Sequence, residues 1–117
     1  MILERLLPRR HDRQVDISCN IGEMRIRGVS SYLSNYDVCV QVPSTRVKTS
    51  LQYYLNNNVT IDFNNVTIHA TLKWYTLENG TYSIGIDINK SYVHEWKRLL
   101  SDKKRIFMHE ARSPVAV

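Results

Sequence analysis

A short run of arginines near the N-terminus contains the residues best suited to binding chemistry. Arg9 and Arg13 are four positions apart with Arg10 between them, and Pro8 argues against a helix through the stretch. Guanidinium groups bind phosphates through paired, charge-assisted hydrogen bonds, and their planes also stack on purine bases. A ligand with both phosphates and guanines would use both abilities, so these three arginines are candidate ligand-binding residues.

The rest of the sequence shows no catalytic or metal-binding arrangement. It contains none of the motifs of nucleophilic hydrolases, metalloproteases, P-loop proteins or dinucleotide-binding folds, and its four glycines are too scattered for a phosphate-binding loop. No cysteines or histidines have the spacing of metal ligands. His69 falls in a strand-like run, where alternation points it toward solvent. We therefore expect a binding protein that is not an enzyme and has no metal or cofactor.

The elements that must position the arginines are mainly strands. From Gln14 the chain alternates apolar and polar residues in short runs, separated by turn signals such as Asn79-Gly80, the strongest hairpin signal in the sequence. Six or seven such strands predict an all-β fold, a small antiparallel barrel over residues 14–88. Residues 1–13 form a basic head that precedes this barrel in a single domain of 117 residues.

Two segments do not follow this alternation clearly. Over residues 47–55, Leu51 and Leu55 fit a helical face, whereas Tyr53 and Tyr54 favour a strand, and a strand is our prediction. Near the C-terminus, an apolar stripe that includes Trp96 and Leu99 predicts one amphipathic helix over residues 91–105, which would cover an opening of the barrel. Residues 106–117 have no clear period and are expected to form a tail.

Several chemically interesting side chains are expected to serve packing rather than ligand binding. Alternation places Trp74 on the same face as the apolar residues of 68–72, and we expect both Trp74 and Trp96 to have core or edge packing roles rather than to stack on a ligand. Cys19 and Cys39 lie in apolar strand-like runs, and we expect both to be buried free thiols.

The net charge indicates an anionic partner without choosing among classes. The formal charge is +5, from 16 lysines and arginines against 11 acidic residues. A nucleotide, a nucleic acid and an acidic protein surface all remain open on this ground. Residues 1–7 carry two charges and are too short for a signal peptide or a membrane span, so we expect a cytoplasmic protein without membrane insertion.

The arginine motif and its surroundings resemble the PilZ family. That family carries an RxxxR motif just before its first strand, and Arg9 to Arg13 match it directly ahead of the run QVDISCNI. Arg5 and Arg9 have the same spacing but lie farther from the strand, so the later pair is preferred. The strand ending at Trp74, the Asn79-Gly80 turn and the run YSIGIDI look like the family's final hairpin, and the helix with Trp96 looks like its closing helix.

The family's second motif, [D/N]xSxxG, is only partly kept. The corresponding residues 32–37 read YLSNYD, in which Ser34 matches the motif. Tyr32 stands where Asp or Asn is expected, and Asp37 stands where Gly is expected. The first change removes a short acceptor, and the second adds a negative charge beside the place of an anionic ligand.

The resemblance implies a bacterial receptor module for the second messenger cyclic di-GMP. It implies that Arg9 and Arg13 are the primary ligands, that Arg10 is a helper and that Ser34 is the surviving contact of the second motif. Because that motif is altered, a PilZ-like adaptor that binds a protein partner instead of a nucleotide is the alternative. A nucleic-acid-binding barrel is a third possibility, based on charge and tyrosine content.

Overall fold

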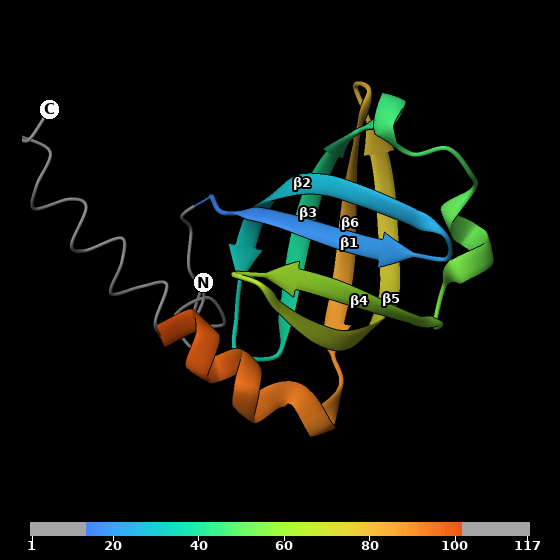
Figure 1. The fold of residues 1–117 in the computed structure, drawn as a ribbon. Helices are drawn as coiled ribbons and strands as arrows, with labels where there is room; N and C mark the ends of the chain where they lie inside the picture. The colour runs from blue at the N-terminus through green and yellow to red at the C-terminus, as the bar shows by residue number, and fades with distance from the viewer. Residues whose placement is uncertain (1–13, 102–117) are drawn as a thin grey trace, which may run out of the picture.

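The structure, a computed structural model, describes residues 14–101 as a small β-barrel with one α-helix (Figure 1). The strands are β1 (Asp16–Ile21), β2 (Met24–Leu33), β3 (Asp37–Pro43), β4 (Asn58–Phe63), β5 (Val66–Glu78) and β6 (Thr81–Ile88). Three short 3₁₀ helices are η1 (Ser44–Arg46), η2 (Leu51–Tyr54) and η3 (Lys90–Tyr92), and the α-helix spans 93–101. The head at 1–13 and the tail at 106–117 lie outside the described residues.

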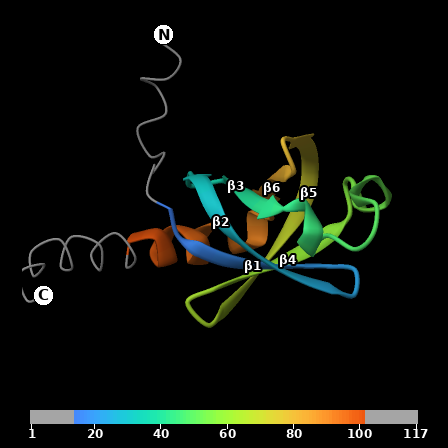
Figure 2. The ribbon, with the colours of Figure 1, turned by 90° about the horizontal axis from the view of Figure 1, so that it is seen from above.

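The barrel closes in the order β1-β2-β3-β6-β5-β4, and every strand pair is antiparallel. Pairing of β1 with β4, in the register Cys19 opposite Ile61, completes the ring. Seen from above, the helix runs underneath the strands (Figure 2). The predicted fold class, a small antiparallel barrel with a C-terminal helix, is confirmed, with six strands.

The tight turns of the barrel follow from local sequence. Asn79 and Gly80 have φ angles of 52° and 77°, and Asn64 and Asn65 have φ angles of 56° and 66°. Two consecutive positive φ values are the signature of the type I′ hairpin turn, which asparagine and glycine tolerate best. The predicted turn at Asn79-Gly80 is therefore confirmed, and Asn64-Asn65 form a second turn of the same kind.

The interior is filled by the inward-facing residues of all six strands and closed at one end by the helix. Val38, Val40 and Val42, which alternate along β3, are fully buried. Trp96 of the helix is also fully buried, and its ring lies 5.4 Å from that of Phe63. The helix therefore acts as a plug, as its apolar stripe predicts.

The prediction of a strand over residues 47–55 is wrong. These residues contain η2, whose Leu51 is buried, while Tyr53 is 71% exposed. Each barrel strand already pairs on both edges, β3 with β2 and β6, and β4 with β1 and β5. A closed ring has no free edge on which this segment could pair, so it crosses between β3 and β4 as a loop.

The prediction that Trp74 shares one face with the apolar residues of 68–72 is also wrong. The register of β5 against β6 shifts between Leu72, opposite Ile86, and Trp74, opposite Gly85. This bulge adds one residue to the strand and reverses the alternation beyond it. Leu72 is fully buried, whereas Trp74 is 41% exposed on the outer face.

The two cysteines are buried thiols that form no disulfide, as predicted. Burial raises the pKa of the Cys19 thiol to about 12, and the negative charge of Asp62 adds to this shift. Cys19 is therefore an unreactive core residue. No helix in the stretch 14–101 has the length and apolar character needed to cross a membrane.

Candidate ligand-binding face

The β2–β3 turn, which contains Ser34, is held together by its own hydrogen bonds. The Ser34 hydroxyl accepts bonds from the backbone N–H groups of Tyr36 and Asp37, at 3.1 and 3.0 Å, and donates to the Asp37 carboxylate. The Ser34 N–H donates to the Asp37 carbonyl at 2.9 Å. These are the bonds by which serine and aspartate commonly stabilise turns.

The same turn is fastened to the barrel and to the helix. The Trp96 indole donates from Nε1 to the Ser34 carbonyl at 2.8 Å, and the Ile88 N–H donates to the Tyr36 carbonyl at 2.8 Å. On the surface, Lys97 Nζ lies 5.0 Å from the centre of the Tyr36 ring and 3.4 Å from its hydroxyl. The turn and the helix therefore form one packed unit.

The two residues that depart from the second motif contact each other. The Tyr32 hydroxyl donates to Asp37 Oδ2 at 3.1 Å. The Asp37 carboxylate thus receives bonds from the hydroxyls of both Ser34 and Tyr32. Where the motif has a glycine without a side chain, this chain has Asp37, whose carboxylate accepts hydrogen bonds from the Ser34 and Tyr32 hydroxyls.

A second carboxylate adjoins Asp37 on the outer face. Asp87 of β6 is the Cα partner of Asp37 of β3. Partial burial raises the pKa of Asp87, and the negative charge of Asp37 raises it further, while Lys73 opposes the shift. This end of the face is therefore acidic, which opposes binding of an anion close to these carboxylates.

Beside Asp37 and Asp87, four residues form one row across four neighbouring strands. Tyr32 pairs with Cys39, Cys39 with Gly85, and Gly85 with Trp74. A Cβ atom at Gly85 would lie only 2.0 Å from Trp74 Cε2, so the indole rests directly on the backbone of this glycine. Trp74 therefore offers a supported aromatic ring that is still 41% exposed.

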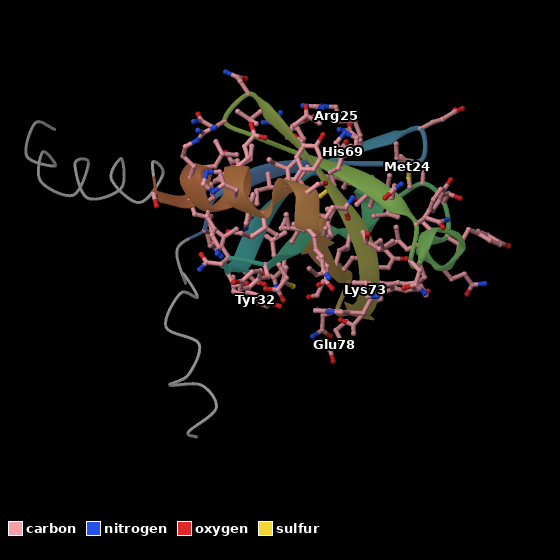
Figure 3. The ribbon with its side chains drawn as sticks, turned by 90° about the horizontal axis from the view of Figure 1, so that it is seen from below. Met24, Arg25, Tyr32, His69, Lys73 and Glu78 are labelled. Atoms are coloured by element: carbon pink, nitrogen blue, oxygen red, sulfur yellow. The ribbon has the colours of Figure 1, made fainter. Side chains whose placement is uncertain are left out.

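The sequence analysis did not identify Trp74 as an outward-facing ring, because the bulge in β5 cannot be recognised from the residue pattern. Figure 3 shows Tyr32 and Lys73, the neighbour of Trp74, along the same edge of the barrel, opposite Arg25. We call the outer surface formed by Tyr32, Ser34, Asp37, Gly85 and Trp74 the turn face.

Of the predicted site residues, only Ser34 lies within the described residues. Ser34 lies in the turn face, with its hydroxyl engaged by Asp37. Arg9, Arg10 and Arg13 lie outside the described residues, and their ligand roles stay predictions. His69 is exposed, as predicted, and its ring lies 4.8 Å from that of Tyr92.

The barrel is similar in fold to several solved structures. The inhibitor of motility MotI/DgrA from Bacillus subtilis aligns with 86% of this chain at 13% identity and a TM-score of 0.57. The PilZ domain of CeSA from a cellulose-synthesising bacterium aligns with 81% of this chain and 97% of that domain, at 18% identity and a TM-score of 0.56. The chain has a PilZ-like fold.

A further PilZ-like match is YcgR from Escherichia coli, solved in complex with c-di-GMP. It aligns with 89% of this chain at 9% identity and a TM-score of 0.56. The chain spans about half the length of MotI/DgrA and YcgR, with 50% and 48% of those chains covered. No model of a known protein family and no curated protein matches the sequence. The PilZ likeness therefore concerns the fold.

Proposed function

We propose that this chain is a non-catalytic receptor module for cyclic di-GMP, with Arg9, Arg10 and Arg13 as ligand-binding residues and the turn face as the barrel side of the site. The PilZ-like fold supports this proposal, because a structural neighbour, YcgR, was solved in complex with the same dinucleotide. In this arrangement the arginines bind phosphates and guanines, and Trp74 offers a ring on which a base can stack.

The observation that carries the proposal is where the chain enters the barrel. Val15 donates its N–H to the Ser30 hydroxyl at 3.0 Å, and Ser30 donates its N–H to the Val15 carbonyl at 2.9 Å. Ser30 is only two residues before Tyr32, on the strand that leads into the turn. The RxxxR motif ends two residues before Val15 in the sequence. This short separation from the strand that pairs with β2 supports the proposed role of the arginines together with the turn face.

Calorimetric titration with cyclic di-GMP tests the proposal. We expect binding in the micromolar range or tighter for the full chain, and a loss of at least about tenfold for Arg9→Ala or Arg13→Ala, since a charge-assisted hydrogen bond contributes about 1.5–3 kcal/mol. The exposed Arg98 provides the control, because Arg98→Ala removes the same charge from the helix. Absence of heat at high ligand concentration would refute the receptor function.

A second candidate function is an adaptor that binds a protein partner without nucleotide. Two features of Asp37 favour the adaptor function. Its carboxylate accepts hydrogen bonds from the Ser34 and Tyr32 hydroxyls, and it lies beside a second carboxylate, that of Asp87. The variant Asp37→Gly separates the two functions. If the natural chain does not bind cyclic di-GMP and Asp37→Gly does, the aspartate has switched off nucleotide binding, and the adaptor is the better account.

A further inference from the structure

A basic hollow on the barrel shares no lining residue with the turn face, and its Asp16 and Val29 directly adjoin the Val15–Ser30 pair. It has a volume of about 810 Å³ and is lined by the outer faces of β1 and β2, the η1 loop and one residue of β4. Its cationic side chains come from Arg25, Arg27, Arg46 and Lys48. Figure 3 places Arg25 on the edge of the barrel opposite Tyr32. The hollow is large enough for a small molecule.

One of the four cations is already neutralised. Arg25 Nη1 forms an ion pair with Asp62 and donates to Asn20 Oδ1 at 3.3 Å. The hydrogen bond from Asn20 lowers the pKa of Asp62, and bonds from Thr67 and Arg25 lower it further, although partial burial opposes the shift. Asp62 therefore stays ionised and keeps Arg25 engaged.

Among the described residues 14–101, no acidic side chain pairs with the other cations in this way. Arg46 Nη1 donates to the Arg27 carbonyl at 2.9 Å, which holds the η1 loop against β2 and forms one wall of the hollow. Within residues 14–101, the side chains of Arg27 and Lys48 have no hydrogen-bond or ion-pair partner. Both are exposed, and Asp16 is the remaining acidic residue of the lining. The hollow therefore has an excess of unneutralised positive charge.

We infer that this hollow is a second binding site, which takes the phosphate groups of a small polyphosphate. Arg27 presents a planar fork that can bind two phosphate oxygens, and Lys48 adds a point charge. The Ser18 and Thr45 hydroxyls also line the hollow and are suited to the same oxygens. Its described lining contains no aromatic residue, so the site recognises linked phosphates rather than a base.

Titration with inorganic triphosphate tests this site independently of cyclic di-GMP. We expect submillimolar binding, a similar affinity for ATP, and binding at least about tenfold weaker for AMP, which lacks linked phosphates. An ATP affinity far above that of triphosphate would mean that the base is recognised and would overturn the phosphate-only site. Amide resonances of Ser18, Val29 and Thr45 should shift on binding, while those of Ser34 and Gly85 stay unchanged.

Matched double variants distinguish a specific phosphate-binding site from nonspecific attraction to positive charge. Arg27→Gln with Lys48→Gln should weaken triphosphate binding at least tenfold. Arg98→Gln with Lys90→Gln removes the same charge elsewhere and should change binding less than twofold. Equal losses in both pairs, shifts outside the hollow, or tighter and steeply salt-dependent binding of a single-stranded oligonucleotide would each overturn the inference. If triphosphate binds while cyclic di-GMP does not, only the receptor function fails.

Discussion

The Tyr32 hydroxyl donates a hydrogen bond to the Asp37 carboxylate across the β2–β3 turn, at 3.1 Å. These two residues replace the Asp or Asn and the Gly of the motif that the chain resembles. Their contact links the two positions, since the Tyr32 hydroxyl stabilises the carboxylate of Asp37. The turn therefore carries a hydrogen-bonded negative charge.

Removing the charge at this turn should strengthen cyclic di-GMP binding. An unpaired like charge near an anionic ligand costs on the order of 1 kcal/mol, so Asp37→Gly is expected to raise the affinity about fivefold. Calorimetry on the full chain measures the change. Glu78→Gln, at the far end of β5, serves as the charge control and should leave the affinity unchanged. An unchanged or weaker affinity in Asp37→Gly would show that the carboxylate does not oppose the ligand.

The supported indole on the outer face should contribute to ligand binding. Stacking of a base on an aromatic side chain contributes about 1–3 kcal/mol, so Trp74→Ala should weaken cyclic di-GMP binding about tenfold. Gly85→Ala should weaken it as well, because the added Cβ would lie 2.0 Å from the ring and displace it. Leu77→Ala, at a 52% exposed position on the same strand, is the control. Full affinity in Trp74→Ala would rule out stacking.

The other tryptophan should control stability. Trp96 is fully buried, and Trp96→Phe removes both ring volume and the donor to the Ser34 carbonyl. We expect a loss of about 2–4 kcal/mol in the free energy of unfolding, from the cavity and the unsatisfied carbonyl together. Urea denaturation followed by circular dichroism measures this loss. Trp74→Phe should change stability by less than about 0.5 kcal/mol, and equal effects of the two substitutions would contradict the structure.

Two carboxylates on the outer surface should have opposite effects on stability as the pH changes. The raised pKa of Asp87 means that its ionised form destabilises the folded chain above that pKa, so Asp87→Asn should stabilise the protein near neutral pH. The lowered pKa of Asp62 means that its ionised form stabilises the fold at neutral pH, so Asp62→Asn should be destabilising.

Both effects should fade on acidification, because each carboxylate becomes protonated. The benefit of Asp87→Asn should disappear as the pH falls through the raised pKa toward the ordinary value of 3.8, and the cost of Asp62→Asn should disappear below that value. Solvent screening keeps each effect below about 1 kcal/mol. Thermal unfolding at several pH values measures both, and the same sign for the two substitutions would contradict the assignment.

Local patterns in the sequence were enough to predict the barrel but not its outer surface. Turns at Asn64-Asn65 and Asn79-Gly80 depend on residues that tolerate positive φ, which the sequence shows directly. The position of Trp74 depends on a bulge set by pairing between β5 and β6, and the loop at 47–55 depends on closure of the ring. Both are long-range features that residue alternation does not reveal.

The candidate site also has one part that the sequence predicts and another part that only the structure reveals. Arg9, Arg10, Arg13 and Ser34 are candidates from motif spacing alone, and their ligand roles stay predictions. The contact between Tyr32 and Asp37 and the approach of Asp87 arise only when β2, β3 and β6 lie side by side. A sequence pattern can show that a motif has changed, but the structure is needed to show what the changed residues touch.

The most direct test of the receptor account is a nuclear magnetic resonance titration of the full chain with cyclic di-GMP, observing the two indole N–H signals. The sequence contains two tryptophans, of which Trp74 is 41% exposed on the turn face and Trp96 is fully buried. The account predicts a large shift of the Trp74 signal, together with amide shifts at Ser34 and Asp37. An unchanged Trp74 signal at saturating ligand, or shifts confined to Arg27 and Lys48, would contradict it.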